Sequence, residues 1–196
     1  LSEAGPTGYT AGDWACATDE TTVPVSDDVV TIAVGQAVTC TIVNDDQAAL
    51  LTLRKVVDAG ATGATQTPAD WTLTATPQGI EGQDPVSGDG ADGVTRVEVF
   101  AGGYGLTEST VPGFTAGAWS CATADGTTVP VADDAVTLAN GADVTCSITN
   151  TAQQPTLTLV KQVVNAAGGT AVATDWTLTA TGPTAGVTGV TGAPAV

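Results

Sequence analysis

Short stretches of alternating apolar and polar residues run along this chain. In Leu51-Thr-Leu-Arg-Lys-Val-Val57 every second residue falls on one face of an extended strand, and no helical spacing occurs in the surrounding hundred residues. Similar stretches predict strands near 51–58, 70–76, 94–99, 103–108, 118–122, 135–138 and 143–150. About seven strands in about 105 residues are typical of an antiparallel β-sandwich, so we predict an all-β fold.

The pattern repeats with a period of about 105 residues. Four blocks recur: residues 1–16 as 106–121, 23–28 as 129–134, 39–44 as 145–150, and 70–76 as 175–181. We therefore predict tandem sandwiches: one complete repeat at 51–154, the C-terminal half of a preceding repeat at 1–50, and the N-terminal part of a following repeat at 155–196. Two interpretations stay open. The chain is a window from a longer array, or residues 155–196 complete residues 1–50 of a neighbouring filament subunit.

Composition narrows the range of partners. The 21 acidic residues against 4 basic ones give a net charge of -17, which disfavours nucleic acid and anionic membrane surfaces. Because 42% of the residues are hydrophobic, the charge does not indicate disorder. No apolar run reaches the roughly 18 to 20 residues of a membrane-spanning helix, so we expect no membrane insertion in this segment.

The only two lysines, Lys55 and Lys161, occupy the same position in the repeat. Each falls on the same strand face as the leucines before it, and so it points toward the predicted core. An unpaired ammonium in a core would cost several kcal/mol or lose its proton. We therefore expect a buried partner for the lysine.

Two other polar residues have the same inward parity. Glu108 shares a strand face with Tyr104 and Leu106, and Asn150 shares one with Ile148. A neutral lysine amine can attack an asparagine amide carbon, and a protonated glutamic acid can hydrogen-bond that amide and relay protons as ammonia leaves. The product would be an isopeptide bond that joins the first strand to the last.

These features resemble a known family. The lysine strand, the Tyr-x-Leu-x-Glu stretch ending at Glu108 and the Ile-Thr-Asn stretch ending at Asn150 are similar to the Cna-B/SpaA-like prealbumin-fold domains of Gram-positive surface proteins and pilins. The resemblance implies a reversed immunoglobulin-like stalk module, often crosslinked by an acid-promoted Lys–Asn bond.

Carried over by motif, the complete set is Lys55, Glu108 and Asn150. The resemblance places two further members, Glu3 as promoting acid and Asn44 as acceptor, in the preceding repeat, and Lys161 in the following one. The alternative at the complete set is that Lys55 extends to the edge of the sandwich and forms only an ion pair with Glu108.

The four cysteines also follow the repeat. They allow three pairings, and the repeat favours one bridge in each domain, namely Cys16–Cys40 and Cys121–Cys146. Free buried thiols in a reducing compartment are the alternative. Without histidine or a Cys-x-x-Cys motif, a zinc site has little support. Disulfides predict an oxidising, extracellular location.

Tryptophans and paired aspartates have structural interpretations. We expect Trp71 and Trp176 to fill the core, and Trp14 and Trp119 to pack on the disulfides; a carbohydrate-binding platform is the alternative. The pairs Asp27-Asp28, Asp45-Asp46 and Asp133-Asp134 are interpreted as solvated turns. They lack the ligand spacing of an EF-hand, although calcium at domain junctions is the alternative.

The sequence therefore predicts a structural module of a bacterial cell surface, a tandem stalk or filament with neighbouring repeats or subunits as partners. We expect no cofactor, no metal and no enzymatic turnover beyond one self-crosslinking event. The rivals are an adhesin domain that binds a glycan or host protein, which the 4% aromatic content disfavours, and the filament subunit described above.

Overall fold

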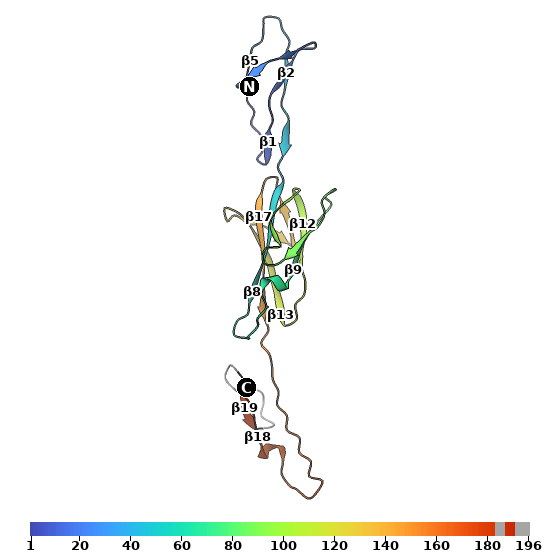
Figure 1. Cartoon of the computed structure of the whole chain (residues 1–196), viewed down its shortest axis with the longest axis vertical. Coiled ribbons are helices and arrows are strands. Elements are labelled where there is room, and N and C mark those ends of the chain that lie inside the picture. Colours follow the sequence, from blue (N-terminus) through green and yellow to red (C-terminus); the bar gives the residue numbers. More distant parts are fainter. Residues whose placement is uncertain (183–186, 191–196) are drawn as a thin grey trace. The chain divides into compact units, whose positions relative to one another are not determined.

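A computed structural model describes residues 1–182 and 187–190 of the chain (Figure 1). The chain divides into two compact units, Leu1–Gln153 and Gln154–Val196. The predicted following repeat at 155–196 lies partly outside the described residues. The first unit contains both the complete sandwich and the segment before it.

The sandwich consists of two five-stranded sheets. One sheet has the order β10-β9-β12-β16-β15, and the other has the order β11-β8-β17-β13-β14. Their strands are β8 (Ala49–Asp58), β9 (Thr72–Pro77), β10 (Val86–Asp89), β11 (Val94–Val99), β12 (Gly102–Glu108), β13 (Phe114–Thr123), β14 (Thr128–Val129), β15 (Val131–Ala132), β16 (Ala135–Leu138) and β17 (Asp143–Ala152). This all-β sandwich confirms the predicted fold class.

One ladder differs from the predicted antiparallel pairing. The first strand, β8, and the last, β17, run parallel, with Lys55 opposite Ile148 and Val57 opposite Asn150. The other ladders of the sandwich are antiparallel. Parallel strands need a long connection, and here the whole of the domain provides it. The two ends of the domain therefore meet in one sheet.

The strand predicted at 70–76 begins later, at Thr72, because a 3₁₀ turn, η1 (Pro68–Asp70), precedes it. The backbone N–H of Thr67 donates to Asp70 Oδ2 at 2.7 Å, which holds that turn. Strands β10, β14 and β15 were not predicted. The last two have only two residues each, and β10 carries a serine and a glycine, so none shows an apolar alternation.

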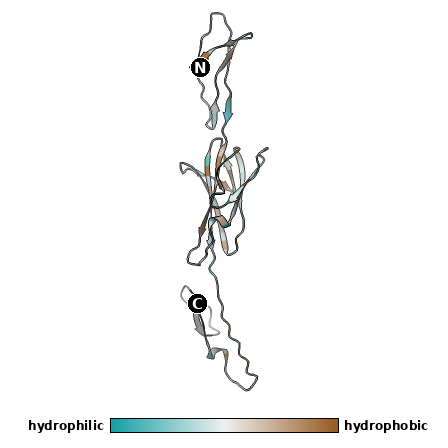
Figure 2. Cartoon of the chain, in the orientation of Figure 1, coloured by the Kyte–Doolittle hydropathy of each residue, from teal (hydrophilic) through white to brown (hydrophobic). Residues whose placement is uncertain are grey.

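The core lies between the two sheets and follows the predicted alternation. In β8 the residues Ala49, Leu51 and Leu53 are fully buried, whereas Arg54 is exposed. The remaining large core side chains include Trp71, Leu73, Tyr104, Val136, Leu138 and Val144. Figure 2 shows brown, hydrophobic stretches among paler ones on the strands of the sandwich.

Residues 1–48 repeat the strand pairs of the second half of the sandwich. They form β1 (Tyr9–Ala11), β2 (Ala15–Ala17), β3 (Thr22–Val23), β4 (Val25–Ser26), β5 (Val29–Val30), β6 (Thr39–Thr41) and β7 (Asn44–Asp46). Cys16 is paired with Cys40 between β2 and β6, as Cys121 is paired with Cys146 between β13 and β17. The same sequence pattern therefore keeps its register in both places.

Two of the three aspartate pairs form hairpin turns. Asp27-Asp28 joins β4 to β5, and Asp133-Asp134 joins β15 to β16, with φ between 49° and 59° at all four residues. A two-residue hairpin loop of type I′ needs positive φ at both positions, which aspartate tolerates better than most residues. Asp45-Asp46 is not a turn but part of β7, the hydrophilic strand that precedes the sandwich in Figure 2.

The second unit contains η2 (Ala173–Asp175), β18 (Thr177–Ala180) and β19 (Val187–Val190), the last two forming an antiparallel pair. The N–H of Val172 donates to Asp175 Oδ2 at 2.8 Å, the same contact that Thr67 makes with Asp70. Trp176 is 36% exposed, so the prediction that it fills a core is wrong for this unit. Among the described residues, its strand β18 pairs only with β19.

Candidate functional site

Lys55 is buried in the sandwich. Its side chain is 0% exposed, and its strand neighbours on the same face are the core leucines of β8. The Nζ atom lies 5.0 Å from the centre of the Trp71 ring. Among the described residues, Glu108 is the one charged partner of this buried amine.

Glu108 meets the lysine from the opposite sheet, at the end of β12. Lys55 Nζ donates a hydrogen bond to Glu108 Oε2 and forms an ion pair with it, and the Glu108 side chain is 12% exposed. Burial lowers the pKa of the Lys55 ammonium below its ordinary value of 10.5, while the hydrogen bond and the charge of Glu108 oppose part of that shift. Lys55 is therefore not exposed at the sandwich edge, but the ion pair with Glu108 that the alternative interpretation expects is present.

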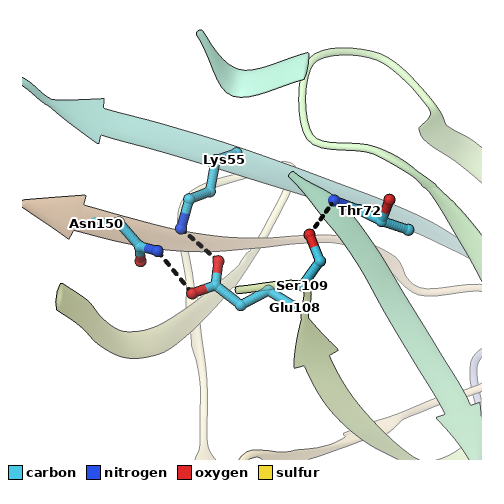
Figure 3. Close-up of polar contacts among 5 residues, drawn as sticks. All are labelled: Lys55, Thr72, Glu108, Ser109 and Asn150. Atoms are coloured by element: carbon cyan, nitrogen blue, oxygen red, sulfur yellow. Dashed lines mark hydrogen bonds and ion pairs between the residues drawn. The ribbon is translucent and has the colours of Figure 1, made fainter. Parts of the chain in front are cut away.

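Asn150 completes the cluster from β17. It is 3% exposed, and its Nδ2 donates to Glu108 Oε1 at 2.8 Å. Its Oδ1 is buried without a hydrogen-bond partner. Figure 3 shows the side chains of Lys55 and Asn150 reaching the two oxygens of the same carboxylate. Three residues that are distant in sequence therefore converge as the strand parity predicted.

Three neighbours that sequence reasoning did not assign to the site hold it in place. Ser109 follows Glu108 and is fastened to Thr72, with its N–H donating to the Thr72 carbonyl at 2.8 Å and its Oγ accepting from the Thr72 N–H at 2.9 Å. Figure 3 includes the second of these bonds. Gly90 accepts a backbone hydrogen bond from Lys55 at 2.9 Å. A Cβ at Gly90 would lie 2.5 Å from Lys55 Cβ, so only glycine fits there.

Trp71 was predicted as a core residue, and it is fully buried with an edge-to-face contact to Phe114 at 5.0 Å between ring centres. Its contact with the lysine was not predicted. A signal was present in the sequence, because a tryptophan follows each lysine at nearly the same distance in both repeats.

The incomplete copies of the site keep their partial contacts. Asn44 Nδ2 donates to Glu3 Oε2 at 3.1 Å, and both residues are exposed. Lys161 Nζ lies 4.7 Å from the ring centre of Trp176, as Lys55 lies over Trp71. Among the described residues Lys161 has no ion pair. The structure therefore brings Glu3 to Asn44.

Both predicted disulfides are present, Cys16–Cys40 and Cys121–Cys146, and no cysteine is free. Each joins two directly paired residues of neighbouring antiparallel strands. Trp119 is 7% exposed and belongs to the core, two residues before its disulfide, whereas Trp14 is only partly buried. The prediction that these two tryptophans pack on the disulfides stays a prediction.

Within the described ranges, 1–182 and 187–190, no three acidic or cysteine side chains gather as they would around a metal ion. The same residues include no helix with the length and hydropathy needed to cross a membrane.

Comparison with known families identifies the chain. The model of the SpaA-type prealbumin-like fold domain matches residues 1–42, 46–148 and 152–196, which is nearly the whole sequence. The chain therefore belongs to this family, as the resemblance indicated. No curated protein and no solved structure shows a significant match.

Membership defines the class of protein. SpaA-like prealbumin domains are structural, non-enzymatic modules of pilus and surface proteins, typically exposed on bacteria. The two disulfides fit an extracellular location. The division into repeats at 1–50, 51–154 and 155–196 stays a prediction.

Proposed function

We propose that this chain is an extracellular stalk or filament segment whose sandwich welds its first strand to its last through a Lys55–Asn150 isopeptide bond. The observation that carries the proposal is one carboxylate, Glu108, contacting both the amine and the amide in a buried setting. The Asn150 carbonyl oxygen has no hydrogen-bond partner, so it is available to accept a proton from Glu108 once the amide turns.

The reaction requires a neutral amine and a polarised amide. Lys55 transfers a proton to Glu108, and burial favours this transfer because it disfavours the charged ammonium. An amide rotation of Asn150 turns Oδ1 toward Glu108, which then donates its proton to that oxygen. Lys55 Nζ attacks Asn150 Cγ, the C–N bond to the amide nitrogen breaks, and ammonia leaves with the protons relayed by Glu108. One amine and one carboxamide become one secondary amide and one ammonia.

The bond would act where a surface fibre needs strength. It would close a loop from residue 55 to residue 150, which the chain-entropy model values at about 4 to 5 kcal/mol. Because β8 and β17 are adjacent and parallel, the link would also carry tension from the start of the domain to its end without loading the strands between. By carrying this tension, the link would also reduce the mobility of the domain along the fibre.

Intact-mass spectrometry of the unfolded, reduced chain tests the proposal. We expect a mass one ammonia below the sequence mass, and a proteolytic fragment joining the peptides of Lys55 and Asn150. The Lys55→Arg variant should regain the full mass. Lys161→Arg is the matched control, because it alters the other lysine and should leave the deficit in place. A wild-type chain at full sequence mass would refute the bond.

A second candidate function has its own observation. The Glu3–Asn44 pair and the Lys161–Trp176 pair are complementary parts of one site, held separately in the two units. We propose, as the alternative, that residues 155–196 of one copy complete residues 1–50 of the next copy in a filament. The missing amine at Glu3 and Asn44 would then come from a neighbouring subunit.

Boiling the chain in detergent separates this alternative from the first. A covalent ladder that disappears in Lys161→Arg but persists in Lys55→Arg supports bonds between subunits. A single band of monomer size would exclude covalent bonds between subunits. The proposed Lys55–Asn150 bond would then be tested by intact mass alone. The adhesin interpretation gains no support from a site among the described residues.

A further inference from the structure

Inside the first unit, the segment 1–48 is tied to the sandwich by backbone hydrogen bonds at Gln47. The N–H of Gln47 donates to the Gly8 carbonyl at 2.8 Å, within the segment, and the Gln47 carbonyl accepts from the N–H of Gly141 in the sandwich at 2.9 Å. The Gln47 side chain is also fixed, since its Nε2 donates to Thr10 Oγ1 at 3.0 Å. One residue thus links both sides of the boundary.

The turn that supplies Gly141 fits closely against Gly8. A Cβ built on Gly8 would lie 2.6 Å from Asn140 Cβ and nearer still to the Asn140 carbonyl oxygen. A Cβ on Gly141 would lie 3.0 Å from Gln47 Oε1 and 3.3 Å from the Gly8 Cα. A side chain at Gly8 would therefore clash with Asn140, and one at Gly141 would be tight against Gln47 and Gly8. We call this contact among Gly8, Gln47, Asn140 and Gly141 the joint.

Both halves of the joint recur elsewhere in the chain, at places where a Cβ on the glycine would meet no other atom of the described residues within 4 Å. At the other end of the sandwich, Gln153 donates from its N–H to the Gly113 carbonyl at 2.8 Å and from its Nε2 to Thr115 Oγ1 at 3.0 Å, as Gln47 does to Gly8 and Thr10. Gly113 has the same φ as Gly8, +84°, but a Cβ there would meet nothing within 4 Å.

The turn recurs as well. In the turn at 139–142 the N–H of Ala142 donates to Ala139 at 3.1 Å, and in the turn at 33–36 the N–H of Gln36 donates to Ala33 at the same distance. Gly35 occupies the place of Gly141 with a positive φ of +80°, and a Cβ on it would meet nothing within 4 Å.

We propose that this joint is a docking contact between successive repeats. The glycine turn of each repeat, at 33–36 or 139–142, packs against a glycine and a glutamine at the end of the repeat before it. The two glycine–glutamine pairs in this chain are Gly8 with Gln47 and Gly113 with Gln153. The partner of the Gly113–Gln153 surface is accordingly the glycine turn of a following repeat of the same kind. The contact aligns neighbouring domains by backbone bonds and does not depend on the isopeptide bond.

Amide hydrogen exchange on the full chain tests the joint. We expect the Gly141 amide to be protected in the wild type, and Gly8→Ala to reduce that protection by about tenfold or more, because the new Cβ displaces Asn140. Gly113→Ala is the matched control. It places alanine at the same positive φ, with the same intrinsic strain, but in open space, so Gly141 should keep its wild-type protection.

Residual dipolar couplings provide a second measurement. The strands β1–β7 and β8–β17 should share one alignment tensor in the wild type and in Gly113→Ala, and should need two in Gly8→Ala. If β1 and β7 themselves lose protection in Gly8→Ala, then Gly141→Ala, which alters the joint from the sandwich side, replaces it. Wild-type Gly141 exchanging at the rate of a free peptide, or unchanged in both joint variants, would overturn the proposal.

Discussion

The chain holds two copies of the same acid–amide pair in opposite surroundings. Glu108 and Asn150 lie inside a complete sandwich with an amine against the carboxylate, and Asn150 is 3% exposed. Glu3 and Asn44 occupy the matching positions of residues 1–48 and make the same hydrogen bond, at 3.1 Å, but both are exposed. The residue types are the same in the two copies, and Asn44 pairs with Ala11 as Asn150 pairs with Ala116.

The difference lies in what covers the pair. In the sandwich, β8 brings Lys55 to the carboxylate of Glu108, Trp71 lies beside the lysine directly before β9, and the surrounding core removes water. Water around Glu3 and Asn44 solvates the carboxylate and the amide, so neither needs the other. A polar pair thus becomes a candidate reaction site only where two further strands enclose it.

The largest effect should come from removing the amide acceptor. Asn150→Ala prevents the isopeptide bond and should lower the free energy of unfolding of the sandwich by about 4 to 5 kcal/mol, because the 55–150 loop is no longer closed. Asn44→Ala changes the exposed copy and should stay within about 0.5 kcal/mol. Denaturant unfolding with intact mass measures both. Equal losses for the two variants would contradict the comparison.

The next largest effect should come from removing Trp71, the aromatic ring beside Lys55. Trp71→Ala should cost about 3 to 5 kcal/mol, since it empties a fully buried site and removes the ring beside Lys55. Trp176→Ala, at 36% exposure beside Lys161, should cost about 1 kcal/mol or less in its own unit. Amide exchange of β8 and of β18 reports the two losses separately. A loss of stability for Trp71→Ala well below this range would mean that the Trp71 ring does not stabilise the sandwich.

Removal of the disulfides should affect the folding of the sandwich less than that of residues 1–48. Both bridges close loops of similar length, with separations of 24 and 25 residues, and each is worth about 3 kcal/mol on the loop model. Without Cys121–Cys146 the sandwich should stay folded, because its core spans two five-stranded sheets.

Without Cys16–Cys40, the three-stranded sheet of β3, β2 and β6 should lose most of its amide protection. The paired serine double variants, compared by hydrogen exchange at 39–41 and at 145–147, decide the point. Greater loss in the sandwich than in residues 1–48 would count against this account.

The smallest effect is a pH dependence of the sandwich that has not crosslinked. In Asn150→Ala, burial still lowers the pKa of Lys55 below 10.5. The unfolded chain then binds more protons than the folded one at pH values between the lowered pKa and 10.5, so stability should rise as pH increases through that window.

Tyr104 acts in the opposite sense above its ordinary pKa of 10.0, because burial raises the pKa of its phenol. Unfolding measured between pH 7 and about 9.5 avoids that contribution. Lys55→Met in the same background should flatten the slope. A slope that persists without the lysine would assign it to another group.

Local pattern was sufficient for much of the fold. The alternation in β8 predicted that Lys55 faces the core with Leu51 and Leu53, and all three are buried. The repeat predicted the cysteine pairs. These predictions succeeded because side-chain direction in a strand has a period of two, and because equal sequences keep equal registers.

Other features of the fold could not be predicted from the pattern of apolar and polar residues. The parallel pairing of β8 with β17, the seat that Gly90 provides for the lysine stem, and the clamp between Ser109 and Thr72 all depend on contacts between distant segments. The strands β14 and β15 are too short to show a period. The exposure of Trp176, where a core residue was predicted, also depends on contacts between distant segments, which the sequence pattern does not show.

By itself, the sequence determined the family, the strand faces, the disulfide partners and the three residue types of the candidate site, since each is written in spacing along the chain. Only the tertiary structure decided which copy of the site is enclosed, because burial is a property of what packs across the sheets. The same Glu–Asn hydrogen bond is solvated in residues 1–48 and dry beside Lys55, and that difference in solvation is what makes amide chemistry conceivable in one copy alone.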